Sequence, residues 1–326
     1  MTRLAIIGAG KWGINHVRTA NALLGLNLVT VCDSRESARQ RVAEIAPGAR
    51  FVTRIEEVSR DPDIDGVVIA TPAGTHYEIT RSMLTAGKAC LVEKPITLAS
   101  AQARELVAIS RDVDRALMVG HVLLYHPAVL EMKRRIDQGL IGRMQYIYSN
   151  RLNLGTIRSE ENILWSFAPH DIAIIQHIVG RKPLNIDTKG ATFLQDDVED
   201  TTITHLTYPG NVHAHVFVSW LHPFKEQRLV VIGHRGMIVF EDTAPTDKLR
   251  FYPKGFDAAD GGLRKFDGEY MTIPYTPEEP LVAEHRHFYE CVEKNQRPIT
   301  DGAHALQVLE ILEEAQGKLR SAYAHQ

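Results

Sequence analysis

The stretch "CLVEKPIT", residues 90–97, places a carboxylate and an ammonium group directly after an apolar run. The apolar run predicts the end of a buried strand, and Glu93 and Lys94 follow it at once. Pro95 biases Lys94 toward an extended backbone. A lysine placed in this way can hydrogen-bond a reacting oxygen and stabilise negative charge that develops on it. A surface lysine at a strand end would have the same local sequence, so the surrounding elements must distinguish the two interpretations.

A glycine motif near the N-terminus has the spacing of a nucleotide-binding turn. Residues 8–13, "GAGKWG", follow a short apolar strand and open a helix pattern, as a G-x-G-x-x-G dinucleotide fingerprint requires. Gly8 permits the tight turn, and Gly10 lets backbone N–H groups approach a pyrophosphate at the helix N-terminus. Gly13 allows the helix to pack closely on the strand.

An acidic residue stands where the adenosine ribose of such a cofactor would lie. Asp33 ends the second predicted strand, 20 positions after Gly13. Its negative charge disfavours a 2′-phosphate, so the sequence predicts NAD as the cofactor. Arg35 could pair with a 2′-phosphate, and NADP therefore remains the alternative.

Residues 3–120 alternate between strand and helix patterns. Near-continuous Val, Ile and Leu strands separated by helices predict a parallel sheet covered on both faces. Ligands of such sheets lie beyond the carboxyl ends of the strands, which is where Lys94 is expected. The predicted cofactor site consists of residues at these strand ends and in the segments that follow them: Gly8, Gly10, Lys11, Trp12, Gly13, Asp33, Ser34, Arg35, Thr71, Pro72, His76, Glu93, Lys94 and Pro95.

The pattern changes after Gly120, where strands that alternate apolar and polar residues predict a mostly antiparallel sheet. The predicted strands are 144–152, 191–195, 200–209, 212–220, 228–236, 237–242 and 249–253, and the predicted helices are 126–139, 170–180, 278–295 and 302–324. We therefore expect an α/β protein with a Rossmann domain at 1–120. An α+β domain for substrate binding and oligomerisation follows at 121–326, and its last helices could pack back on the first domain.

Composition excludes several classes of function. The formal net charge of −3 gives no electrostatic reason to bind nucleic acid or an anionic membrane. The three cysteines are far apart, and the first apolar run is too short and too interrupted by glycines for a signal peptide, so a cytoplasmic protein with reduced thiols is expected. His205, His213 and His215 do not have metal-ligand spacing, and no metal site is predicted.

The whole chain resembles the glucose-fructose oxidoreductase, inositol dehydrogenase and rhizopine catabolism family (Gfo/Idh/MocA). The resemblance rests on the segments "IIGAGKWG" (6–13), "IATPAGTHYE" (69–78), "VEKPIT" (92–97), "MVGHVLLYHPAV" (118–129), "FAPHDI" (167–172) and "EEPLVAEHRHFYE" (278–290). It implies an NAD(P)-dependent oxidoreductase that acts on the CH–OH group of a sugar or polyol.

The resemblance also assigns roles to individual residues. It implies that Lys94 touches the reacting hydroxyl and the nicotinamide ribose, often beside a cis proline, and that His170 is the acid/base residue at the start of its helix. Glu93 is expected to orient Lys94 or to face the cofactor. The chain departs from the family pattern at Ser166 and Ala173, where an Asp is usual, and at Ala168, where a Gly is usual. The loss of these carboxylates argues against an inositol-type substrate.

The segments "GHVLLYHPA" and 150–171 are similar to members that oxidise the 3-hydroxyl of a UDP-N-acetyl sugar or its uronic acid. The predicted substrate residues are His121, Tyr125, Arg151, Asn153, Arg158 and Ser166. The alternatives are a dehydrogenase or ketoreductase of a free sugar, polyol or dTDP-deoxysugar, and a non-catalytic regulator that senses NAD(P). The open face of the second sheet predicts a homodimer or homotetramer.

Overall fold

The structure is a computed structural model that describes residues 2–158, 161–259 and 261–323. It divides the chain into two compact units. The first unit combines the residues up to Tyr125 with Glu278–Leu309, and the second combines His126–Pro277 with the residues from Glu310 on. Residues 159 and 160 of the predicted substrate segment, and residue 324 of the last predicted helix, lie outside the described residues.

The first unit is built on a six-stranded parallel sheet with the strand order β3-β2-β1-β4-β5-β6. The strands are β1 (Leu4–Ile7), β2 (Leu28–Cys32), β3 (Arg50–Val52), β4 (Gly66–Ile69), β5 (Ala89–Glu93) and β6 (Leu117–Gly120). The central strands β1 and β4 are buried along their whole length, because helices cover both faces of a parallel sheet.

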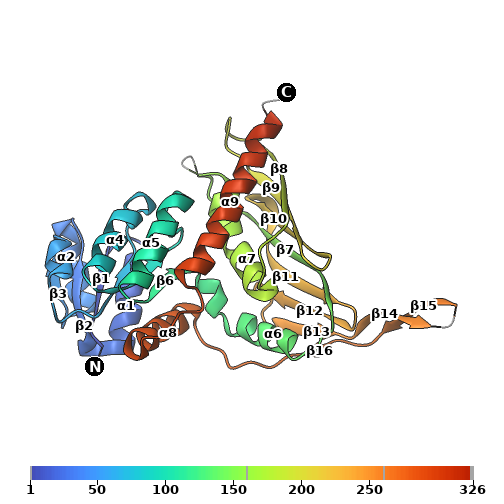
Figure 1. Cartoon of the computed structure of the whole chain (residues 1–326), viewed down its shortest axis with the longest axis horizontal. Helices are drawn as coiled ribbons and strands as arrows, with labels where there is room; N and C mark the ends of the chain where they lie inside the picture. The colour runs from blue at the N-terminus through green and yellow to red at the C-terminus, as the bar shows by residue number, and fades with distance from the viewer. Residues whose placement is uncertain (1, 159–160, 260, 324–326) are drawn as a thin grey trace. The chain divides into compact units, whose positions relative to one another are not determined.

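Helices pack around this sheet, and all of them except the short helix Glu56–Ser59 are predicted by the sequence pattern. They are α1 (Gly13–Leu24), α2 (Arg39–Ile45), α3 (Glu56–Ser59), α4 (His76–Thr85), α5 (Ser100–Asp112), α8 (Pro280–Lys294) and the first turns of α9 (Gly302–Tyr323). Helix α4 packs against α5, and α1 packs against α8, which comes from the far end of the chain (Figure 1).

The second unit contains an eight-stranded sheet with the order β16-β13-β12-β11-β7-β10-β9-β8. Its strands are β7 (Met144–Leu154), β8 (Asn185–Ala191), β9 (Thr201–Tyr208), β10 (Val212–Ser219), β11 (Leu221–Gly233), β12 (Gly236–Glu241), β13 (Leu249–Tyr252) and β16 (Met271–Thr272). Every pair is antiparallel except β10 with β7. The expected fold class, a Rossmann sheet followed by a mostly antiparallel sheet, is confirmed.

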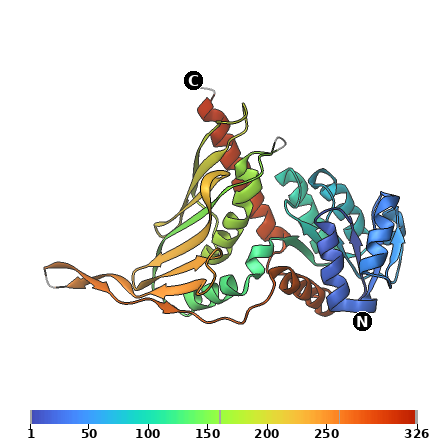
Figure 2. The ribbon, with the colours of Figure 1, turned by 180° about the vertical axis from the view of Figure 1, so that it is seen from behind.

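Only one face of the second sheet is covered by helices within the described residues. Helices α6 (Pro127–Asp137), α7 (Ile163–Val179) and the later part of α9 lie on that face (Figure 1). A two-stranded hairpin, β14 (Lys254–Ala259) with β15 (Gly262–Asp267), projects from the edge of the sheet (Figure 2). The alternation of apolar and polar residues did not reveal this hairpin, because even apolar side chains such as Phe256 and Leu263 are exposed in it.

The helix that carries His170 begins earlier than the sequence predicts. Helix α7 starts at Ile163, and the Asn162 side chain caps it by accepting the N–H of Trp165 at 3.2 Å. The predicted start at residue 170 is wrong, because the helix extends seven residues further upstream and contains Pro169 in its interior. His170 therefore lies in the interior of α7, not at its N-terminus.

The strand predicted at residues 191–195 is also wrong. Strand β8 ends at Ala191, and a buried carboxylate organises the chain beyond it. The Asp200 carboxylate accepts the N–H groups of Phe193 at 2.6 Å and Leu194 at 2.9 Å, and also the indole N–H of Trp220. Satisfying these backbone donors with a side chain bends the segment out of the sheet.

We predict that Asp200→Ala lowers the free energy of unfolding by about 3 kcal/mol, because the buried indole N–H of Trp220 and the part-buried N–H groups of Phe193 and Leu194 lose their acceptor. Asp187→Ala on the exposed side of β8 is the matched control, and we expect it to change stability by less than about 0.5 kcal/mol. Urea unfolding of both variants measures the difference. Equal midpoints would show that the Asp200 contacts do not stabilise this corner.

Candidate active site

The glycine turn has the shape that the dinucleotide motif requires. Gly8 has a φ of +99°, and its N–H donates to the carbonyl of Cys32 at 2.7 Å. A Cβ on Gly13 would lie 2.1 Å from the carbonyl oxygen of Gly8, so no larger residue fits there. At Gly10 the nearest group that a Cβ would meet is the Arg35 guanidinium, 3.7 Å away. The turn is thus closed toward the protein and open toward a pyrophosphate, which fits a dinucleotide.

Asp33 directly follows β2 as a fully hydrogen-bonded carboxylate. It accepts the N–H of Ala9 at 2.8 Å and the N–H of Arg35 at 2.9 Å. The Arg35 guanidinium forks onto both oxygens at 3.0 and 2.9 Å. Burial alone would raise the pKa of Asp33, but the hydrogen bonds from Arg35 and Ala9 outweigh it and the pKa is lowered. Asp33 is therefore charged at neutral pH, and its carboxylate already binds the Arg35 guanidinium. Lys11 and Ser34 are exposed beside this edge.

His76 ties together the ends of two strands. Its ring nitrogens lie 2.7 Å from the carbonyl oxygen of Pro95 and 2.9 Å from that of Thr71, beyond β5 and β4. The His76 side chain is buried, so its contacts hold the edge of the sheet in shape. Pro72 precedes a short 3-10 turn in which the Thr75 hydroxyl donates to Thr71.

Glu93 and Lys94 end β5 at this same edge. The Glu93 carboxylate accepts the indole N–H of Trp12 at 2.6 Å and the N–H of Lys94 at 3.1 Å, and it lies 2.9 Å from Nε2 of His16. The Lys94–Pro95 peptide bond is cis. Glu93 therefore positions the backbone of Lys94, in line with one of its two expected roles.

Two more predicted residues follow β6. His121 is buried with its ring against that of His304 at 5.6 Å, and its Nδ1 has no hydrogen-bond partner among the described residues. Burial, followed by the charges of His304 and Lys94, lowers the pKa of His121 well below its usual value, so its ring is neutral. Tyr125 lies in the core of the first unit, where its hydroxyl is 3.1 Å from that of Thr300.

In the second unit, the residue after His170 fixes the helix to the sheet. The buried Asp171 carboxylate accepts the hydroxyl of Ser149 at 2.6 Å and the guanidinium of Arg151 at 2.7 and 3.3 Å. Both partners come from β7, so Asp171 sets the rotation of α7 about its axis. The half-buried His170 is positioned by that rotation. Arg151 is paired with Asp171 and is not a free cation.

The other predicted substrate residues have different surroundings. Ser166 is buried on α7, and its hydroxyl has no partner among the described residues. The Asn153 side chain packs over Gly155, and its Oδ1 also lacks a partner in the described part of the chain. Arg158 lies in an exposed segment, where it donates to Glu161 at 2.6 Å.

Sequence reasoning missed His16 and Asp171, which hold Glu93 and Arg151. A histidine three residues after the last motif glycine and an acid after His170 were the available signals, but neither has specific spacing. Within the described ranges, no group of three His, Cys, Asp or Glu residues could hold a metal ion. Over the same residues, no helix is long and apolar enough to cross a membrane.

Comparison with known proteins matches both halves of the chain to one family. The profile described as "Oxidoreductase family, NAD-binding Rossmann fold" matches residues 2–121, and the "GFO/IDH/MocA C-terminal domain" matches residues 129–239. The chain belongs to the Gfo/Idh/MocA oxidoreductase family.

Individual members of this family are similar over much of the chain. A crystal structure described as an oxidoreductase from Magnetospirillum magnetotacticum MS-1 is 31% identical with a TM-score of 0.83, covering 96% of this chain and 98% of the other. The scyllo-inositol 2-dehydrogenase (NAD(+)) of Bacillus subtilis is 26% identical over 95% of this chain and 91% of its own. The UDP-N-acetylglucosamine 3-dehydrogenase of Acidithiobacillus ferrooxidans is 27% identical over 61% of each chain.

The family match confirms the expected NAD-binding Rossmann domain. The glycine turn, Asp33 and the strand-end residues of this Gfo/Idh/MocA protein provide the groups that would hold the dinucleotide.

We predict that NAD binds roughly tenfold or more tightly than NADP, a difference of about 1.4 kcal/mol, because Asp33 repels a 2′-phosphate and occupies Arg35. Asp33→Ser should weaken NAD binding and strengthen NADP binding, since it removes the repulsion and releases Arg35. The matched control adds Arg35→Ala to that variant and should abolish the gain for NADP. Fluorescence titration of the three proteins with NAD and with NADP measures these affinities, and equal or tighter NADP binding by the unaltered protein would refute the role of Asp33.

Proposed function

We propose that this protein uses NAD to oxidise a secondary hydroxyl of a sugar to a ketone, with Lys94 and His170 as the catalytic residues. The observation that carries the proposal is the position of Lys94, at the end of β5 beside the Glu93 carboxylate. This is the same sheet edge at which the glycine turn and Asp33 fit a dinucleotide. A nicotinamide-dependent dehydrogenase needs a proton-handling group at this edge.

Bound NAD would supply the acceptor for the hydride that leaves the alcohol carbon. Lys94 would hydrogen-bond the hydroxyl oxygen and stabilise the negative charge that develops there. His170 would accept the hydroxyl proton, as a neutral imidazole does near neutral pH. The rotation of α7 set by Asp171 would keep the His170 ring in a fixed direction.

We propose the 3-hydroxyl of a nucleotide-activated sugar, UDP-N-acetylglucosamine or its uronate, as the point of oxidation. Support comes from the similarity to UDP-N-acetylglucosamine 3-dehydrogenase and from Ser166, which stands where the family pattern usually has an Asp. Arg158 of the 150–158 segment is exposed, and a diphosphate could replace its present partner Glu161. Arg151 contributes less than the sequence implied, because Asp171 already neutralises it.

A polyol is the second candidate, and one observation favours it. The scyllo-inositol 2-dehydrogenase of Bacillus subtilis is similar over 95% of this chain, a longer match than that to the nucleotide-sugar enzyme. A cyclic polyol carries no phosphate and would need no cation such as Arg158.

A substrate panel distinguishes these candidates. We expect UDP-N-acetylglucosamine or its uronate to reduce NAD and to give a 3-ketone. In the same assay Arg158→Ala should raise KM for the UDP-sugar without lowering kcat, because it would remove only a binding contact. Reduction of NAD by myo-inositol or glucose, with no response to any UDP-sugar, would contradict the nucleotide-sugar assignment. A protein that binds NAD but turns over no compound of the panel would instead be a regulator.

Substitution of the two catalytic candidates tests the mechanism. Lys94→Met should fold and bind NAD, but its turnover should fall roughly a hundredfold or more, the effect of losing one positioned electrostatic group. His170→Asn should cost a similar factor and should remove the acidic limb of the pH–rate profile, since protonation of His170 would no longer matter. The double variant should lose far less than the product of the two, because both residues act on one proton transfer. Near-unaltered turnover of Lys94→Met at saturating substrate would exclude Lys94 from the chemistry.

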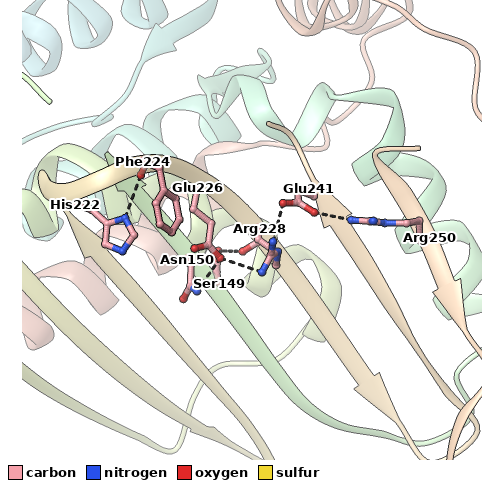
Figure 3. A network of polar contacts seen from close by, with 8 residues as sticks. All are labelled: Ser149, Asn150, His222, Phe224, Glu226, Arg228, Glu241 and Arg250. Atoms are coloured by element: carbon pink, nitrogen blue, oxygen red, sulfur yellow. Dashed lines mark hydrogen bonds and ion pairs between the residues drawn. The ribbon is translucent and has the colours of Figure 1, made fainter. Parts of the chain in front are cut away.

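We also propose that the protein is a cytoplasmic dimer or tetramer that pairs through the open face of the second sheet. Figure 3 shows a polar network on this unit in which Arg228 contacts Glu226 at 3.3 Å and Glu241 at 2.7 Å. Arg250 contacts Glu241 from the next strand, and Asn150 donates to Glu226 at 3.1 Å. The rings of Tyr146, Tyr148 and His215 lie on the same face. A face with paired charges and clustered rings is suited to burial against a second copy.

Light scattering at micromolar concentration should therefore give at least twice the monomer mass. Arg228→Glu should shift the protein toward monomer, because it places a third acid against Glu226 and Glu241. Lys182→Glu, on an exposed residue paired with Glu310 of α9, is the control and should keep the original mass. A monomeric unaltered protein would refute this assembly.

A further inference from the structure

A row of hydrogen-bonded side chains leads inward from Glu93 through His16 to His285. Nε2 of His16 lies 2.9 Å from the Glu93 carboxylate, and Nδ1 of the same ring lies 2.8 Å from Nε2 of His285. Both histidines are buried, His16 on α1 and His285 on α8. Helices α1 and α8 thus meet through one hydrogen bond between residues that are 269 positions apart.

The chemistry of the acceptors gives this chain a direction. An ionised carboxylate can only accept, so Nε2 of His16 carries the proton that points to Glu93. His285 then donates its Nε2–H to Nδ1 of His16, which fixes the tautomer of both rings. Nδ1 of His285 has no partner among the described residues, as expected for a lone pair rather than an N–H group. Burial lowers the pKa of His285 well below its usual value, in agreement with a neutral ring.

A second buried carboxyl group next to the chain carries no charge. Glu284 precedes His285 on α8, is fully buried, and has no hydrogen-bond partner at either oxygen within the described residues. Burial, followed by the charge of Glu93, raises the pKa of Glu284 well above its usual value. The pKa of Glu93 is lowered, because the hydrogen bonds from His16 and Trp12 outweigh the effect of burial. The negative charge of the cluster is therefore concentrated on Glu93.

The order of the strands places this charge relative to the cofactor. Asp33, directly after β2, is positioned for the adenosine ribose, and the glycine turn after β1 is positioned for the pyrophosphate. In the strand order β2-β1-β4-β5, the rest of the dinucleotide must continue toward the ends of β4 and β5. Glu93 ends β5, and Trp12 of the glycine turn bonds to it. The nicotinamide ring is cationic when oxidised and neutral when reduced, so a carboxylate at this place distinguishes the two states.

We propose that His285 and His16 are positioning residues that hold Glu93 as a carboxylate against the nicotinamide site, and that this charge makes the protein prefer the oxidised cofactor to the reduced one. The inference rests on NAD binding at this edge and goes beyond the proposed reaction. It identifies the group that sets the balance between the two cofactor states, and it assigns a function to two histidines that the catalytic steps do not use.

The test compares the dissociation constants of NAD⁺ and NADH by calorimetry, without any sugar present. Glu93→Gln keeps the shape but removes the charge, and it should reduce the preference for NAD⁺ roughly tenfold, the size of a partly screened charge pair. His285→Leu should shift the ratio in the same direction by a smaller factor, roughly threefold, because His16 loses the donor that fixes its tautomer. His285→Gln should restore the ratio, since its amide N–H can still donate to His16.

His287→Gln is the matched control on the same helix. The His287 ring accepts the N–H of Ile299 at 3.1 Å and takes no part in the chain to Glu93, so its replacement should leave the ratio unchanged. A ratio that does not change in Glu93→Gln would overturn the proposal. An equal shift in His285→Gln and His285→Leu would overturn the role of the hydrogen bond from His285 to His16.

A measurement on the unaltered protein keeps the inference testable if a variant does not fold. Nitrogen NMR shifts of labelled histidine should show His16 and His285 protonated at Nε2 and not at Nδ1. A proton on Nδ1 of His16 would contradict the donation from His285 to His16. Neither experiment involves a substrate, so a failure to oxidise any sugar would leave their outcomes unaffected.

Discussion

A carboxylate at the end of a buried strand is stable only when hydrogen-bond donors surround it. The donors to Glu93 bring together several elements of the first unit. One donor, the N–H of Lys94, is local, whereas Trp12 and His16 come from the glycine turn and the helix after it. His16 is in turn held by His285, so α8 returns from the end of the chain to pack on α1. The same contacts join the cofactor turn to the strand end that presents Lys94.

Buried carboxylates have a comparable role in the second unit. Asp171 fixes α7 to β7 through Ser149 and Arg151, which leaves His170 beside it in a defined direction. Asp200 shapes the segment after β8 by accepting two backbone N–H groups and the indole of Trp220. An unpaired charge in these positions would be costly, so each carboxylate commits several neighbours to one arrangement.

The sequence was most informative where a residue's role depends on near neighbours. The parallel strands, the glycine turn, Asp33 and the strand-end position of Lys94 follow from local spacing and apolar runs. It failed where a distant partner decides the structure. Helix α7 begins upstream of Pro169, where the Asn162 side chain caps it, and residues 193–194 leave the sheet because Asp200 binds their N–H groups. The contact between His16 and His285 joins positions 269 residues apart and leaves no periodic signal.

We expect the carboxyl ends of the strands in the first sheet to hold NAD from Asp33 to Glu93 and to present Lys94 to the substrate. A crystal structure of the protein with NAD tests it most directly. The account predicts the adenosine ribose hydroxyls on the Asp33 carboxylate, the pyrophosphate over the turn at Gly10, and the nicotinamide ring beside Glu93 and Lys94. Adenosine bound away from Asp33, or a nicotinamide ring remote from both Glu93 and Lys94, would contradict it.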